Sequence, residues 1–186
     1  MNDEFRVNFI HRSSFLASPF MDIRQALQAE HSKPQTMKIV TYVGADKTRF
    51  AELMKIFFAG EYRLTQRAAW PLNYCAERHS DLIQPYLPKL LNCLSREDVH
   101  AAVKRNIVRL LQFVEIPKKL HAKTYSLCVD LVDDPNEPVA VRVFAMTVAA
   151  RIAKSEAALM NELRLIVRQH LPHSTAAFQK RAKAIM

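Results

Sequence analysis

The sequence predicts an all-α solenoid, and two features carry this prediction. Similar residue patterns surround positions 67, 105, 143 and 181, which lie 38 residues apart. A fixed period of this size is typical of stacked helical pairs that bury their faces only against one another. The second feature is the scarcity of glycine, since only Gly44 and Gly60 occur among 186 residues. Hairpins and phosphate-binding loops draw on glycine, so its scarcity favours helices and disfavours a Gly-rich nucleotide site.

The period continues through the first helix of each copy. Apolar residues recur there on three helical phases, which we interpret as the core. The rows are Leu53, Leu91, Val129 and Val167; Ile56, Leu94, Val132 and His170; and Leu87, Tyr125 and Leu163.

Two helices are predicted before the pairs begin. Residues 22–31 form a short helix, and a second starts at Ser32 as the cap, with Pro34 in its first turn, and stops near Gly44. Ser80 and Lys154-Ser155 are the expected caps of the second and fourth pairs. The four predicted pairs are 46–59 with 61–78, 81–94 with 97–115, 117–132 with 137–153, and 155–170 with 174–186.

Prolines set most of these boundaries. Pro117, Pro135, Pro138 and Pro172 fall where helices are predicted to start or stop. Pro71, Pro85 and Pro88 instead fall inside predicted helices. We expect bends there because the apolar phase continues across them, and the alternative is that each such helix is two shorter ones.

Composition limits the partners and the compartment. The net charge of +9 and the pI near 9.7 favour acidic partners, namely nucleic acid, an anionic membrane surface or an acidic protein. Cys75, Cys93 and Cys128 are odd in number and widely spaced, which indicates thiols in a reducing cytosol, with Cys93 and Cys128 in the core. No segment approaches the roughly 20 apolar residues of a membrane span. We therefore expect a cytoplasmic protein without a membrane partner.

Residues 1–20 are expected to be a disordered extension of a single domain over residues 21–186. Polar residues interrupt the phenylalanines of this segment, so it has no continuous apolar stretch of the kind found in signal peptides. A cleaner amphipathic pattern begins at Met21. The alternative is that residues 1–20 reflect an upstream start that is not the native one.

The second helix of each pair carries a pattern that resembles a known family. Val103-Lys104 is followed by apolar residues at 107, 108, 110, 111 and 114, and Val141-Arg142 is followed by a similar series after the acidic turn 134–138. This pattern resembles the second helix of a HEAT repeat. The proline-containing segment 82–91 looks like a HEAT first helix. The resemblance covers about residues 46–186, and the first copy departs from it by having Thr65-Gln66 in place of Val-Arg.

The resemblance implies a fold and two functions. The implied fold is a right-handed α–α superhelix of about four HEAT-like hairpins. HEAT solenoids act as non-enzymatic scaffolds or adaptors that curve their second helices around a macromolecular partner. The HEAT-like DNA glycosylases, which excise alkylated bases, use a basic concave face on DNA. The alternative is therefore nucleic-acid binding on the basic inner face, with base excision if the chain is a relative of these glycosylases.

A row of arginines is the predicted partner-binding site. On the helix over 97–115, Arg105 and Arg109 lie opposite the apolar stripe, and Arg67 and Arg181 occupy equivalent positions in other copies. We predict that Arg67, Arg105, Arg109 and Arg181 contact the partner, the alternative being a solvated face. Val143 and Thr147 interrupt the row, which favours a protein partner over a continuous phosphate backbone.

No residue pattern indicates an enzyme, a metal or a cofactor. Trp70 could stack on a base, but its repeat equivalents Val108 and Met146 are apolar, so we predict that it lies in the core. Cys75 and His79 have a spacing that can bind zinc, yet no further ligands stand at a recognisable spacing. We therefore predict no catalytic, cofactor-binding or metal-binding residue.

Overall fold

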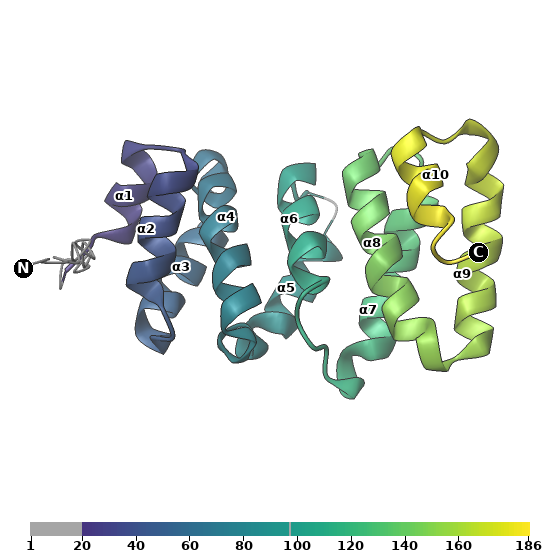
Figure 1. The fold of residues 1–186 in the computed structure, drawn as a ribbon, viewed down its shortest axis with the longest axis horizontal. Helices are drawn as coiled ribbons and strands as arrows, with labels where there is room; N and C mark the ends of the chain where they lie inside the picture. The colour runs from purple at the N-terminus through teal and green to yellow at the C-terminus, as the bar shows by residue number, and fades with distance from the viewer. Residues whose placement is uncertain (1–19, 97) are drawn as a thin grey trace, which may run out of the picture.

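The computed structural model describes residues 20–96 and 98–186, which form ten α-helices and no strand (Figure 1). Short 3₁₀ turns at Ser80–Leu82, Gln84–Tyr86, Ala153–Ser155 and Leu171–His173 connect some of them. The all-α prediction is confirmed. The helices are α1 (Ile23–Ala29), α2 (Lys33–Val43), α3 (Lys47–Phe58), α4 (Tyr62–Arg78), α5 (Leu87–Leu94), α6 (Ala101–Leu111), α7 (Lys118–Asp133), α8 (Val139–Ile152), α9 (Ala157–His170) and α10 (Ala176–Ala182).

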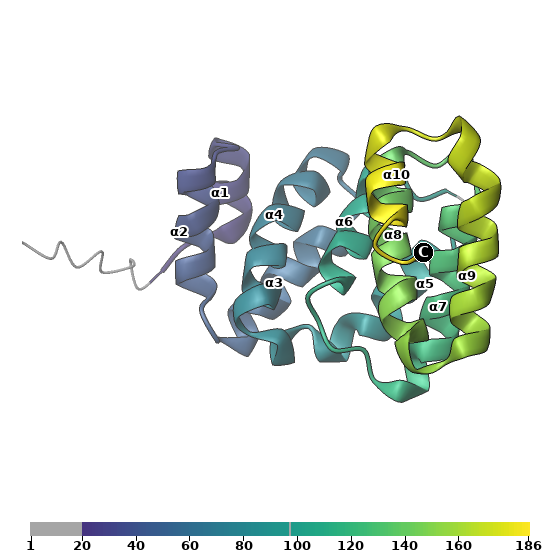
Figure 2. The same cartoon turned by 45° about the vertical axis from the view of Figure 1, so that its right-hand side comes forward.

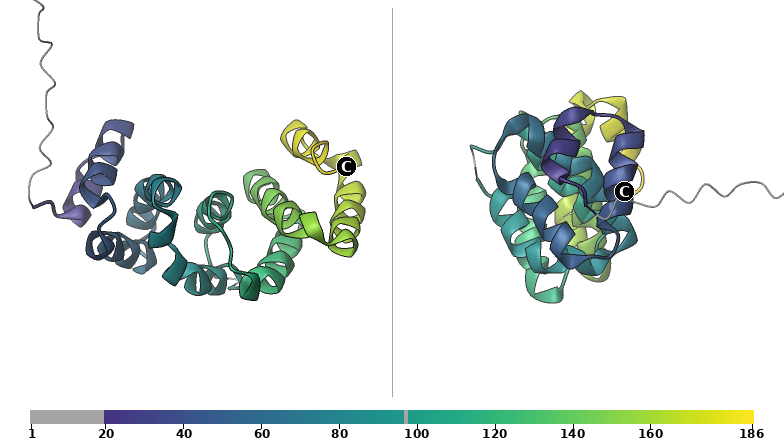
Figure 3. Two further views of the ribbon diagram at one scale, coloured as in Figure 1. Left: turned by 60° about the horizontal axis from the view of Figure 1, so that its bottom comes forward. Right: turned by 90° about the vertical axis from the view of Figure 1, so that its left-hand side faces the viewer.

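The helices stack as pairs in a curved array of two rows (Figure 3). We call α2, α4, α6, α8 and α10 the inner helices, because they line the concave side and each contacts the next. The outer helices α3, α5, α7 and α9 form the convex side. Figure 2 shows the far end, where α10 packs on α8. Because α2 packs on α4 as later inner helices pack on one another, the two N-terminal helices act as a first pair before the four predicted ones.

One continuous core runs through the stack. Leu53, Leu91 and Val167 are fully buried, as their shared phase predicts. Leu111 and Ala149, which are equivalent in α6 and α8, are also fully buried. His170 is the exception in its row, because its half-buried ring bonds to the Asp133 carboxylate at 2.9 Å. The 38-residue period therefore sets the packing of the stack.

The predicted caps hold for α2 but not for the later helices. Ser32 Oγ accepts from the Gln35 N–H at 3.2 Å, and Gly44 ends α2 with a positive φ of 50°, as predicted. The predicted caps at Ser80 and Ser155 are wrong. Both serines lie in 3₁₀ turns that take up the chain before the next helix begins, and neither makes a side-chain cap bond.

Proline breaks the segment 81–94, where we expected one bent helix. The described chain has two 3₁₀ turns there, and α5 starts only at Leu87. Pro85 removes a donor and blocks the preceding turn, whereas Pro88 fits the first turn of the new helix, where no donor is needed. Pro71 remains inside the continuous α4.

Helix α6 is shorter than the predicted 97–115. The ring nitrogen Nδ1 of His100 accepts from the Ala102 N–H at 3.0 Å and caps the helix, which ends at Leu111. Histidine is not among the usual N-cap residues, so the sequence pattern did not locate this start.

Arginine side chains close several helix ends. Arg49 donates to the Tyr42 carbonyl at 2.7 Å, and Arg142 donates twice to the Val132 carbonyl at 3.0 and 2.8 Å. Arg151 of α8 reaches the preceding pair and donates to the carbonyls of Leu111, Gln112 and Val114. The last carbonyls of a helix have no partner within it, so these contacts satisfy them and tie neighbouring elements together.

The structure describes almost none of the predicted N-terminal extension. The proposed extension over 1–20 lies, apart from Phe20, outside the described residues.

Burial raises the pKa of the Cys75 and Cys128 thiols to about 12 each. Cys93 is half-buried and packs against the edge of the core, where it lines a hollow together with Phe58 and Val99. No helix in the described part is both long and apolar enough to cross a membrane.

Replacing Leu91 by alanine is expected to lower the free energy of unfolding by about 2–5 kcal/mol, because a fully buried side chain would leave a cavity. Denaturant unfolding followed by circular dichroism measures the change. The matched control is Leu165→Ala on α9, where the side chain is 60% exposed, with an expected effect below about 0.5 kcal/mol. Similar losses in both variants would contradict the assigned phase.

Candidate functional site

The inner helices carry a strongly one-sided charge. They contain twelve lysines and arginines and one acidic residue, Glu77. Helices α1, α3, α5, α7 and α9 contain ten basic and four acidic residues. The inner helices are therefore more uniformly basic than the other helices of the stack.

Four of the twelve inner cations are held by the protein itself. Arg67, Arg142 and Arg151 donate to main-chain carbonyls, and Lys104 pairs with Glu137. The other eight make no hydrogen bond or ion pair with any residue that the structure describes. They are Lys33, Lys38, Arg63, Arg78, Arg105, Arg109, Lys180 and Arg181.

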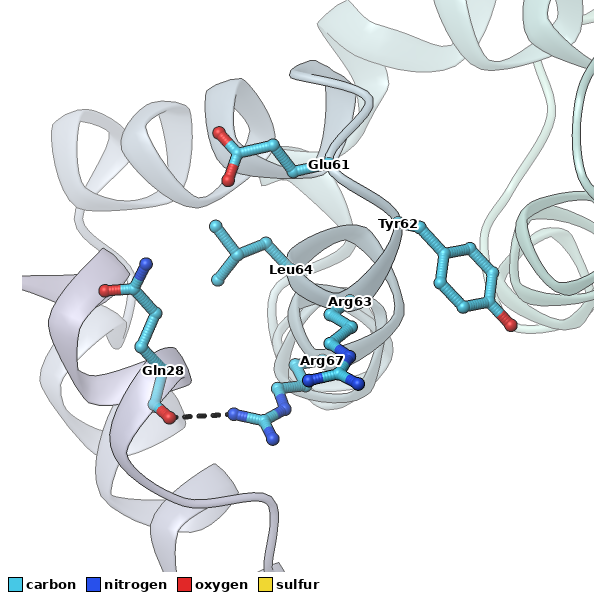
Figure 4. Close-up of a pocket in the computed structure, with 6 residues that line it drawn as sticks. All are labelled: Gln28, Glu61, Tyr62, Arg63, Leu64 and Arg67. Carbon is cyan, nitrogen blue, oxygen red and sulfur yellow. Dashed lines mark hydrogen bonds between the residues drawn. The ribbon is translucent and has the colours of Figure 1, made fainter.

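A first groove of about 480 Å³ runs between α1 and α4 (Figure 4). Arg63 and Arg67 line it side by side, and Arg67 Nη1 donates to the carbonyls of Leu27 and Gln28, at 2.8 Å each. The Glu61 carboxylate also borders the groove, but Arg24 holds it at 2.6 and 3.0 Å. The hydrogen bond from Arg24 lowers the pKa of Glu61, so this carboxylate stays ionised.

A second hollow of about 250 Å³ lies between α4 and α6, and we call it the α4–α6 hollow. Two cations, three carboxamides and two aromatic rings line it. They are Arg105, Arg109, Gln66, Asn73, Asn106, His31 and Trp70. No carboxylate is among these lining residues, so the hollow is suited to an anionic group.

Trp70 is part of this wall and does not lie in the core, so that prediction was wrong. Its ring is half-exposed and lies against His31, with ring centroids 5.3 Å apart and a tilt of 56°. The equivalent Val108 and Met146 are fully buried. Those smaller or more flexible side chains fit between helices, whereas the indole lies at the surface beside the α1–α2 connection.

Asn73 is the most unusual residue of the hollow. Its side chain is nearly fully buried at 5% exposure, and its Nδ2 donates to the Ala69 carbonyl at 2.7 Å. Its carboxamide oxygen has no donor among the described residues. The equivalent positions hold the core residues Leu111 and Ala149. A polar residue in an apolar row is a signal that the sequence contained and that our prediction missed.

The predicted arginine row is not continuous in space. Arg67, Arg105 and Arg109 gather around α4 and α6, whereas half-buried Arg181 lies on α10. Between them α8 presents Val143 and Thr147, and the Thr147 hydroxyl donates to the Val143 carbonyl at 3.0 Å within the helix. The basic surface is thus divided at α8, whose two arginines, Arg142 and Arg151, are bonded to main-chain carbonyls. His31 lies between α1 and α2, before the four pairs that the sequence predicted, so their period did not identify it.

Cys75 and His79 are not joined by further potential metal ligands in the described part of the chain. Over residues 20–96 and 98–186, no group of three or more His, Cys, Asp or Glu side chains is placed to hold a metal ion. Cys75 is buried and His79 ends α4.

Comparison with known proteins gives one match. A family model described as a HEAT repeat domain matches residues 23–186. This match begins at α1, so it includes the first helix pair that the sequence pattern had left outside the repeats. No curated protein matches the chain, and no solved structure does.

Arg67 and Arg105 occupy equivalent positions but differ in their contacts, and stability should reveal this. Arg67→Ala is expected to cost about 1–3 kcal/mol, because two carbonyls at the end of α1 lose a charged donor. Arg105→Ala should change stability by less than about 0.5 kcal/mol, since its side chain is exposed and unpaired. Denaturant unfolding of the two variants measures both. A larger loss for Arg105→Ala would contradict this division.

Proposed function

The chain belongs to the HEAT repeat family, and from this premise we propose that it is a scaffold whose inner helices bind an acidic segment of a protein partner. The observation that carries the proposal is the charge of the inner helices, which have twelve basic residues against one acidic residue. Eight of these cations have no partner in the described part of the chain, so they are available to another molecule.

The curved stack suits this function. Single exposed ion pairs contribute only about 0–1 kcal/mol each, so one arginine would bind little. Several unpaired cations along one concave surface can engage the same partner at once, and their summed field also speeds its approach. A segment of acidic and apolar residues would complement both the unpaired cations and the uncharged side chains of Val143 and Thr147 on α8.

The division of the basic surface favours a protein over a nucleic acid. Packed helices are about 8–10 Å apart, and a nucleic-acid strand carries a charge about every 3.4 Å along a duplex. A strand that crosses α8 would therefore place phosphates over Val143 and Thr147, where no cation faces them. A polypeptide can place apolar residues there instead.

Nucleic-acid binding is the second candidate, and Trp70 is the observation that favours it. A half-buried indole that lines the same hollow as Arg105 and Arg109 can stack on a base while the arginines contact phosphates. We restrict this candidate to binding, because no carboxylate that could assist base excision lines the α4–α6 hollow in the described chain.

The double reversal Arg105→Glu/Arg109→Glu is expected to remove the partner protein in affinity capture from the native cell, because attraction becomes repulsion. The melting temperature should stay nearly unchanged, since neither side chain bonds within the described protein. The matched control is Lys119→Glu/Arg168→Glu on α7 and α9, which changes the net charge equally at exposed outer positions. Equal loss of the partner in both variants would indicate a general charge effect and contradict an inner binding face.

Salt dependence separates the two candidates. If the partner is a protein, the purified chain should bind single-stranded DNA at low salt only. At physiological salt no saturable binding is expected, because salt screens weak contacts between exposed charges. Titration with fluorescent oligonucleotides at several salt concentrations measures this. Saturable binding at physiological salt, with a steep log–log salt slope that Arg105→Glu/Arg109→Glu reduces, would replace the first candidate with the second.

A further inference from the structure

We propose that the α4–α6 hollow is the anchor subsite of this surface and takes an acidic side chain together with a neighbouring aromatic side chain of the bound segment. The inference rests on the proposed function and adds the chemistry that this subsite selects. Three independent features of the hollow support it: two unpaired guanidinium groups, a half-exposed indole and a buried acceptor without a donor.

The guanidinium groups determine the acidic part. Arg105 and Arg109 are four residues apart on α6, so they lie on one face of the helix, one turn from each other. Neither side chain bonds to a described residue. Arg67, which is the equivalent of Arg105 in α4, instead donates to main-chain carbonyls. Guanidinium groups bind carboxylates through paired, charge-assisted hydrogen bonds. An Asp or Glu side chain that enters the hollow would therefore meet two cations and no lining carboxylate.

The indole determines the aromatic part. Trp70 presents part of its indole at the hollow, and the His31 ring lies against it. Aromatic rings pair favourably in tilted or offset arrangements. Tryptophan and arginine are also the residue types most enriched where a few side chains carry most of the binding energy of an interface.

Asn73 adds a main-chain contact. Its buried carboxamide oxygen lacks a donor, although other copies hold Leu111 and Ala149 in this place. A polypeptide carries a backbone N–H at every residue except proline, so a bound segment brings a donor together with its side chains. Because this oxygen is buried, the Asn73 carboxamide has to turn toward the hollow on binding, and the peptide N–H would then satisfy an acceptor that the described residues leave unpaired.

The size of the hollow agrees with side chains as the occupants. Its volume of about 250 Å³ is below the 300–1,000 Å³ typical of small-molecule and cofactor pockets. It also continues into an open concave surface, so a longer segment can lie across it. An anchor pair of side chains fits this volume better than a whole cofactor does.

Trp70 is the only tryptophan in the chain, so its indole N–H gives one NMR resonance at the subsite. We would titrate ¹⁵N-labelled protein with the blocked peptide acetyl-Glu-Phe-Asp-amide. Saturable movement of this resonance is expected. The peptides acetyl-Gln-Phe-Asn-amide and acetyl-Glu-Ala-Asp-amide should each bind about tenfold more weakly, because each lacks one part of the pair.

Two variants test the assigned residues. Arg105→Gln/Arg109→Gln should abolish discrimination between the acidic and the neutral peptide. A single, sharp indole resonance should remain, because the variant stays folded. Asn73→Leu introduces an apolar residue, as in the other copies. It should weaken binding of the acidic peptide without lowering the melting temperature. The control Lys119→Gln/Arg168→Gln should bind as the unchanged chain does.

Distinct results would overturn the subsite and the proposed function. If no peptide moves the Trp70 resonance, or if the neutral peptide binds as well as the acidic one, the subsite inference fails. The proposed function would still stand if affinity capture of the partner depended on Arg105 and Arg109. If a short oligothymidylate moves the resonance at lower concentration than the acidic peptide, the subsite binds nucleic acid and both proposals fail.

Discussion

The structure depends on burial between successive helix pairs. A single pair has apolar faces on both sides and cannot cover them alone, so each pair requires the next. Leu111 and Ala149 are equally and fully buried although they lie in different pairs, because each occupies the same place in the stack. The curved array and its concave surface follow from this requirement. A binding surface is thus a consequence of how the chain is stabilised, and its specificity comes from residues that stacking leaves free.

Helix ends impose a second requirement that divides the arginines into two groups. Closely stacked helices leave carbonyls at their ends, and Arg67, Arg142 and Arg151 supply donors to them. Burial lowers the pKa of the Arg142 guanidinium, which nevertheless lies over the Phe178 ring and bonds to a carbonyl. Arg105 and Arg109 have no such structural role in the described chain. The net charge of +9 therefore overstates the positive charge available to a partner.

The sequence predicts the repeat well and the candidate site only in part. Periodicity identifies the stacked pairs because burial selects apolar residues at the same phase in each copy, as at Leu53 and Leu91. It fails where one residue departs from the average of its row. Pro85 lies in a 3₁₀ turn where the apolar phase alone predicts a continuous helix, and Trp70 is too large to be treated as another Val108. Where a side chain of this kind lies depends on the space that its neighbours leave in the folded chain. The repeat pattern of a single sequence does not give that space.

Asn73 connects stability with binding. A buried polar atom without a partner costs about 1–3 kcal/mol, and an apolar side chain of similar shape would avoid this cost. The chain places leucine and alanine at the same position of later pairs, so its fold does not require asparagine there. Departures from a local rule are expected at functional sites, where a binding partner compensates for them. Asn73 lies in the wall of the same hollow as Arg105, Arg109 and Trp70. The buried acceptor of α4 that lacks a donor therefore lies beside two unpaired arginines of α6, and the proposed binding of an acidic segment addresses both.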